Sequence, residues 1–315
     1  MLETWFTLNL PTRETVDLQR QSFLPEGTEG PFKHLKRLSV LSGIHGDELE
    51  GLYICYRLAS FLKENSQAIR GVIDIYPSLN PLGVSMTRRF VPFFEMDLNR
   101  MFPGDSFGSL PEKMAHAAVH AVSGSNIAVD LHASNIFLKE IPQVRIDEGN
   151  TSKLLPLAKI LNVDFVWVYT SVTVLRSTLA HTLNAIGVRT LVVEMGVGLR
   201  VTPVFGDQLV SGLLHLMAHE GFLSLDSPPE VREPIVSINE QVYFINAGCS
   251  GLFIPGADHG GRIGKEEVIG QIVSPFTGEG LETLRSPADG LLFTLRAYPI
   301  VFEGSLVARV CALEG

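Results

Sequence analysis

The chain has 315 residues, of which 45% are hydrophobic and 19% are charged, and its formal net charge is −9. This length and composition predict one large globular domain with a smaller appendage and argue against intrinsic disorder. An acidic chain also argues against nucleic-acid binding, which depends on clustered Lys and Arg side chains. No apolar run reaches the roughly 20 residues that a membrane-spanning helix requires, so we expect no membrane partner.

The cysteines and the N-terminal segment bear on the cellular compartment. The chain has three cysteines, Cys55, Cys249 and Cys311. Because this number is odd and the three lie far apart in the sequence, we expect no disulfide framework. The segment MLETWFTLNLPTRETVDL lacks the basic start and continuous apolar stretch of a signal peptide. Both observations predict a cytoplasmic protein. The sequence leaves the formation of a homo-oligomer open.

Apolar periodicity predicts strands that alternate with helices through most of the chain. The predicted strands are residues 36–42, 71–77, 127–131, 163–169 and 190–193. The predicted helices are residues 49–64, 112–122 and 208–219. This alternation predicts an α/β fold, in which a mostly parallel or mixed sheet is flanked by helices.

The texture of the sequence changes near Ser227-Pro228-Pro229, after which short apolar segments are separated by Gly and Pro. Short strands with such turns predict a small all-β domain. This segment resembles domains of the barrel-sandwich, lipoyl-like type. We therefore divide the chain into an α/β domain, residues 1–227, and a C-terminal β-domain, residues 228–315. A lipoyl-type carrier function is not expected, because the candidate hairpin tips SPFT and PADG contain no Lys.

Potential metal ligands follow two of the predicted strands. His45 and Glu48 come after the strand 36–42 in the segment GIHGDE, and His132 ends the segment DLH after the strand 127–131. Catalytic side chains in open α/β sheets gather at the carboxyl ends of strands, so we expect these three to converge. Two His and one Glu form a ligand set of catalytic zinc that leaves one position open for water. The pattern therefore predicts one zinc ion per chain.

Further polar side chains occupy positions that suit catalysis. Glu194 follows the predicted strand TLVV, where a carboxylate could accept a proton from water as general base. Asn99 and Arg100 lie in the segment DLNRMFPG, and the planar donor fork of Arg suits a substrate carboxylate. Arg88 and Arg89 lie upstream and offer a cation for a polarised carbonyl oxygen.

Taken together and in this order, GIHGDE, DLNRMFPG, DLH and VVEMG resemble the succinylglutamate desuccinylase/aspartoacylase family of the zinc carboxypeptidase superfamily. The resemblance runs from about residue 41 to residue 198, and the later segment SPADG resembles the β-domain of many family members. It implies that residues 1–227 form a zinc carboxypeptidase-like catalytic domain in which His45, Glu48 and His132 bind zinc. It also implies that Glu194 is the catalytic glutamate.

The same resemblance assigns residues to the substrate side of the site. It implies that Asn99 and Arg100 bind a substrate carboxylate and that Arg89 stabilises the oxyanion. Because Arg88 directly precedes Arg89, which of the two faces the site stays open. The resemblance also implies that Asp97 supports a zinc-binding histidine from outside the ligand shell, where such carboxylates orient the imidazole.

These implied roles predict a zinc-dependent hydrolase that cleaves the amide bond of a small N-acyl amino acid or a related carboxylated substrate. The alternative is a zinc carboxypeptidase that acts on peptides, since the same ligands and carboxylate clamp would serve it. The β-domain favours the deacylase, because in this family such domains narrow the mouth of the cleft. A binding protein without turnover is expected to lack a ligand or the base, and here all four positions are filled.

Other histidines have spacings that imitate metal sites. His116 and His120 lie four residues apart in a helical stretch, as do His215 and His219, but each pair lacks the glutamate of the H-E-x-x-H motif. We interpret both pairs as residues on helix faces. We interpret His259, in the turn ADHGG, as a solvated loop residue.

Overall fold

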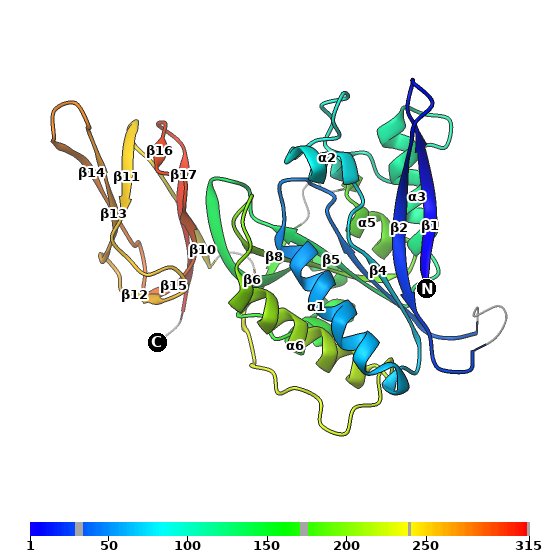
Figure 1. Ribbon diagram of the computed structural model, residues 1–315. Helices are drawn as coiled ribbons and strands as arrows, with labels where there is room; N and C mark the ends of the chain where they lie inside the picture. Colours follow the sequence, from blue (N-terminus) through cyan, green and yellow to red (C-terminus); the bar gives the residue numbers. More distant parts are fainter. Residues whose placement is uncertain (29–33, 171–175, 239–240, 314–315) are drawn as a thin grey trace.

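The structure, a computed structural model, describes residues 1–28, 34–170, 176–238 and 241–313. A mixed sheet flanked by helices is followed by a second, antiparallel sheet from the C-terminal residues, which confirms the predicted fold class (Figure 1). The strands before residue 239 are β1 (Leu2–Asn9), β2 (Thr15–Phe23), β3 (Arg37–Ser42), β4 (Val72–Tyr76), β5 (Ile127–Ala133), β6 (Leu138–Asp147), β7 (Phe165–Tyr169), β8 (Arg189–Gly196) and β9 (Ile235–Ile238).

The helices lie between these strands. They are α1 (Glu50–Glu64), α2 (Pro81–Met86), α3 (Leu110–Val122), α4 (Thr151–Lys159), α5 (Leu179–Ala185) and α6 (Pro203–His219), with the 3₁₀ helices η1 (Ser66–Ala68), η2 (Leu98–Arg100) and η3 (Glu148–Asn150). None of the helices in the described ranges combines the length and apolarity needed to cross a membrane.

The central sheet has the strand order β1-β2-β4-β3-β5-β8-β6. Strands β4, β3, β5 and β8 run parallel to one another, as the alternation of strands and helices predicts. Strand β2 and strand β6 are antiparallel to their neighbours β4 and β8, so the sheet is mixed. Strand β6 was not predicted from the sequence.

Strand alternation decides which side chains meet the core and which meet the opposite face. Val129 and Leu131 of β5 are buried in the core beneath α1 and α6. Their neighbours Asp130 and His132 therefore point to the other face, where α5 lies (Figure 1). Helix α1 begins at Glu50, one residue after the predicted start at residue 49, so Glu48 lies just before the helix.

The C-terminal strands extend the central sheet as well as forming their own. They are β10 (Val242–Asn246), β11 (Gly251–Pro255), β12 (Arg262–Ile263), β13 (Val268–Val273), β14 (Gly280–Arg285), β15 (Gly290–Arg296), β16 (Ile300–Val301) and β17 (Leu306–Ala312). Strand β15 pairs with β6, and β17 and β10 follow it, so the central sheet continues into the C-terminal region. Strand β9 pairs with β7 of the central sheet. The division at residues 227 and 228 stays a prediction.

The packing of α6 predicts a sharp effect at one glycine. A Cβ atom added to Gly212 would lie 1.9 Å from the backbone oxygen of Leu161. Although Ala favours a helix over Gly by about 1 kcal/mol, we expect Gly212→Ala to lower the free energy of unfolding by about 1–3 kcal/mol, measured in urea. Gly124→Ala is the control, since nothing lies within 4 Å of its added Cβ. Unchanged stability in the Gly212 variant would contradict this packing.

Candidate active site

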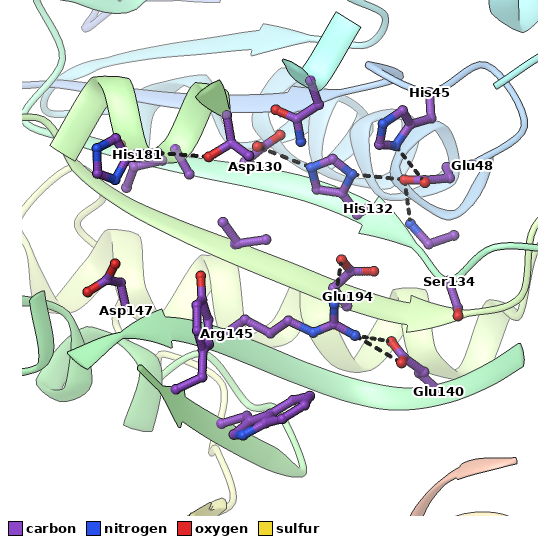
Figure 2. Close-up of a pocket in the computed structure, with 18 of the residues that line it drawn as sticks. His45, Glu48, Asp130, His132, Ser134, Glu140, Arg145, Asp147, His181 and Glu194 are labelled. Carbon is purple, nitrogen blue, oxygen red and sulfur yellow. Dashed lines mark hydrogen bonds and ion pairs between the residues drawn. The ribbon is translucent and has the colours of Figure 1, made fainter. Parts of the chain in front are cut away.

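The predicted metal ligands converge at the carboxyl edge of the sheet (Figure 2). His45 lies in the loop after β3, Glu48 lies just before α1, and His132 lies near the end of β5. The Nδ1 atom of His45 is 2.6 Å from one Glu48 oxygen, and Nδ1 of His132 is 2.9 Å from the other. One ligand atom from each residue lies within 4.8 Å of the others, a spacing that a metal ion could bridge.

In both imidazoles the inner nitrogen, Nδ1, faces Glu48, and the outer nitrogen, Nε2, lies beside another carboxylate. The Nε2 atom of His45 lies 3.0 Å from Asp97, and Nε2 of His132 lies 3.1 Å from Asp130. Metal-ligating histidines ordinarily donate their other ring N–H to a carboxylate, which fixes the ring and leaves the inner nitrogen free for the metal. Two inner nitrogens and a carboxylate also suit zinc in number and chemistry. The residues present therefore fit a zinc ion.

Local sequence accounts for this convergence. Asp130 and His132 are two residues apart on β5, so they share a face while Leu131 points into the core. In the loop before Glu48, a Cβ atom at Gly46 would lie 2.0 Å from the backbone of Gly83. Gly46 is thus required by the close approach of another backbone segment.

In the absence of a metal, attraction between carboxylates and imidazoles stabilises the group of predicted ligands. Burial by itself would lower the pKa of His132, but the carboxylates of Asp130 and Glu48 outweigh it and raise this pKa well above its ordinary value. Burial would raise the pKa of Glu48, but the two imidazoles hold it below its ordinary value. The group therefore retains protons that an incoming metal ion has to displace.

Glu194 lies beside the ligand group on the next strand. In the parallel pair of β5 and β8, Glu194 is the partner of His132, and its side chain is 16% exposed toward a cavity of about 710 Å³. Burial raises the pKa of Glu194, with Glu140 and Glu48 adding to the effect against the pull of Arg145. A carboxylate with a raised pKa at the edge of a cavity is suited to take up and release protons.

The structure settles the orientation of the neighbouring arginines. Arg89 lines the cavity and places Nη1 2.8 Å from Glu48, whereas the side chain of Arg88 is exposed and does not line it. Asn99 and Arg100 also line the cavity. The side-chain oxygen of Asn99 accepts a hydrogen bond from the backbone of α5, so Asn99 has a structural contact besides its predicted role.

The position of Arg100 leaves most of its donors available. Its Nη1 atom donates to the backbone oxygen of Asn99 at 2.8 Å. Within the described ranges, no carboxylate comes within 4 Å of its guanidinium nitrogens. A guanidinium at a cavity wall without such a partner can donate charge-assisted hydrogen bonds to a bound anion.

Several cavity residues escaped the sequence analysis. Glu140 and Arg145 come from β6, Trp167 from β7, and Phe244 and Arg309 from the C-terminal strands. The only sequence signal is the presence of charged residues inside otherwise apolar strands, as in LKEIPQVRID and LVARVCA. Such a signal marks a buried charge but does not say which cavity it faces.

The four histidines whose spacing imitates a metal site lie outside the cavity wall, whereas His181 of α5 lines it. His116, His120, His215 and His219 are absent from the cavity wall, and the ring of His215 contacts the backbone oxygen of Pro229 at 2.8 Å. The interpretation of His259 as a solvated residue is wrong. Its ring is partly buried, and burial together with Lys139 lowers its pKa to about 4.

Comparison with known proteins places the chain in a family. Residues 34–220 match the succinylglutamate desuccinylase/aspartoacylase catalytic domain, so the chain belongs to this family. Among characterised proteins, it is 26% identical over 284 residues to N-alpha-acetyl-L-2,4-diaminobutyric acid deacetylase from Halomonas elongata. That alignment covers 86% of this chain and 80% of the relative.

Solved structures share the fold over nearly the whole chain. A succinylglutamate desuccinylase from Silicibacter sp. TM1040 has a TM-score of 0.84 at 19% identity, covering 99% of this chain and 95% of that one. The product-bound ectoine utilization protein EutE (DoeB) from Ruegeria pomeroyi has a TM-score of 0.79 at 20% identity, covering 95% and 90%. At these identities, the likeness extends to the fold.

Removal of a ligand provides the first test of the site. We expect the purified chain to bind about one divalent transition-metal ion, measured by elemental analysis after dialysis. His45→Ala should lose that ion, because the two remaining donors, Glu48 and His132, are too few to hold it. His215→Ala is the control and should retain it. Full metal content in His45→Ala would contradict the assignment.

Proposed function

We propose that this protein is a zinc-dependent deacylase that hydrolyses the amide bond of a small N-acyl amino acid. The observation that carries the proposal is the position of Glu194 beside the group His45, Glu48 and His132, on the wall of a cavity that also exposes Arg100. Membership of the family and the deacetylase activity in the name of the Halomonas relative support it.

Each step of the hydrolysis is assigned to a residue of the site. Zinc bound by the three ligands would supply Lewis acidity toward the amide carbonyl and make water more acidic. Glu194 takes a proton from the attacking water and delivers it to the departing amine nitrogen. Arg89 donates to the carbonyl oxygen as negative charge develops there. The C–O bond forms, the C–N bond breaks, and a carboxylic acid and a free amine leave.

The substrate side follows from the free donors of Arg100. Asn99 and Arg100 hold a carboxylate close to the scissile amide, which aligns the carbonyl with the metal group. Asp97 and Asp130 keep the two imidazoles in place. A carboxylated acyl amino acid is therefore the substrate class that the cavity favours.

The alternative, a zinc carboxypeptidase that trims peptides, would use the same groups. The cavity wall argues against it, because Phe244 and Arg309 from the C-terminal strands bound the space beside Glu194 and Glu140. The deciding assay measures amine release from N-acetyl, N-succinyl and other N-acyl amino acids, diamino acids included, alongside peptides of three or more residues. Faster cleavage of the peptides would replace the deacylase by the carboxypeptidase.

Replacing Glu194 separates a proton acceptor from a metal ligand. Glu194→Gln keeps the size of the side chain but cannot accept the proton, so we expect turnover to fall by about 10²-fold or more with near-normal zinc content. Glu95→Gln, an exposed carboxylate outside the cavity, should behave as the wild type. Loss of zinc from the Glu194 variant would make it a ligand and overturn the assigned role.

Replacing Arg100 tests the carboxylate clamp. Because a charge-assisted bidentate contact is lost, we expect Arg100→Ala to raise KM by about 10- to 100-fold, with kcat falling as well if the anchor aligns the carbonyl. Arg100→Lys should recover only part, since Lys supplies the charge without the planar fork. The exposed neighbour provides the control variant Arg88→Ala.

A substrate analogue completes this test. Wild-type enzyme should lose about as much on the amidated analogue as Arg100→Ala loses on the acid, and the variant should lose little more, because both changes remove one interaction. Equal rates of the wild type on the acid and on its neutral analogue would reject the clamp.

A further inference from the structure

A chain of ion pairs leads from the C-terminal strands to Glu194. Arg309 of β17 places Nη1 2.6 Å from Glu140. Arg145 donates to both oxygens of Glu140, at 2.9 and 2.8 Å, and places Nη1 3.2 Å from Glu194. Figure 2 shows Arg145 extending between the carboxylates of Glu140 and Glu194. Arg309 therefore pairs with Glu140 and not with Glu194, whereas Arg145 pairs with both carboxylates.

An irregularity in β6 makes this arrangement possible. Strict alternation would point Glu140 and Arg145 to opposite faces of the sheet, since five positions separate them. In the pair with β8, however, Glu140 stands opposite Gly196 and Gln143 opposite Glu194, so β6 has one extra residue. Pro142 lies in this bulge, where its missing N–H costs no ladder hydrogen bond. The bulge turns Glu140 onto the face of Arg145.

The C-terminal strands bring Arg309 to the same face by register. Thr294 of β15 is the partner of Glu140, and Arg309 of β17 is the partner of Thr294, so the three form a row across the sheet. The guanidinium carbons of Arg145 and Arg309 lie 5.8 and 5.7 Å from the centre of the Trp167 ring. These cation–π contacts limit the positions that the two guanidinium groups adopt.

The charges of the group are balanced. Two carboxylates face two guanidinium groups, and the side chain of Glu140 is only 1% exposed. Without Arg309, Glu140 would keep Arg145 as its one ion-pair partner among the described residues, besides a hydrogen bond from Thr294. A buried charge that loses a partner is strongly unfavourable. Arg145 would then be drawn toward Glu140 and away from Glu194.

We propose that Arg309 is a positioning residue for the reaction, acting through Glu140 and Arg145 to hold the carboxylate of Glu194 in place. The C-terminal strands thereby contribute to the chemistry as well as to the cavity wall. This inference rests on the proposed role of Glu194. It predicts that turnover depends on a residue that touches neither substrate nor metal.

The test compares variants of the full-length, metal-loaded enzyme. Arg309→Met should lower kcat by about 10- to 100-fold, the range for residues that orient an active-site group, with KM changed by less than about twofold. Arg309→Lys should recover most of kcat, because Arg309 uses a single nitrogen on Glu140. The control is Arg296→Met on β15, whose side chain binds backbone oxygens of Tyr298 and Ile300 away from the cavity, and it should retain wild-type kcat.

Clear outcomes would overturn the proposal. A raised KM with unchanged kcat would make Arg309 a substrate-binding residue. Unchanged kcat and KM, or a folded Arg309→Lys variant without recovery, would exclude a positioning role through charge. If Arg309→Met does not fold, Glu140→Gln provides the same test, with a loss of kcat as the expected result. The kcat of the double variant Arg309→Met/Glu140→Gln should be no lower than the kcat of Glu140→Gln alone, because Arg309 acts through Glu140.

A second measurement separates this proposal from the proposed function. If the wild type cleaves no acyl amino acid, the function fails, but the chain of contacts still predicts coupling in urea unfolding. Arg309→Met and Glu194→Gln should change the folding equilibrium constant non-additively, by about twofold or more, although the two side chains do not touch. Additive effects would show that the contacts do not transmit from Arg309 to Glu194.

Discussion

The side chain of Glu48 is only 4% exposed, so its carboxylate is a buried charge. Much of the site consists of the groups that compensate this charge. An ionised carboxylate costs several kcal/mol to bury unless charged or hydrogen-bonded partners surround it. Two imidazoles and Arg89 supply such partners, and the imidazoles are in turn held by Asp97 and Asp130. The same arrangement that compensates Glu48 also presents three ligand atoms to one point.

Sheet geometry explains how few residues achieve this. Parallel strands in register place the partner of His132 on β8, which is Glu194, without any adjustment by loops. The alternation that turns these two side chains toward the cavity turns Leu131 and Val193 into the core beneath α1 and α6. Packing on the apolar face of the sheet therefore also fixes the side chains on its polar face, so His132 and Glu194 are positioned by the core itself.

The sequence predicted what depends on local order along the chain. The fold class and the approach of His45, Glu48 and His132 follow from polar motifs placed directly after apolar strands. Strand β6 could not be predicted, because its bulge and its buried charges disrupt both the alternating and the continuous apolar pattern. The meeting of Glu140 with Arg309, 169 positions later, depends on which strands pair, and no local pattern in the sequence encodes that choice.

Strand pairing also determines how the C-terminal region meets the cavity. Backbone hydrogen bonds between β6 and β15 set its orientation, and β17 and β10 continue the same sheet. A slip of one residue in β15 would turn every side chain of that strand to the other face. Phe244 and Arg309, which are partners across β10 and β17, line the cavity because of this register. The width of the cavity beside Glu194 is thus a property of sheet register, and no flexible linker has to maintain it.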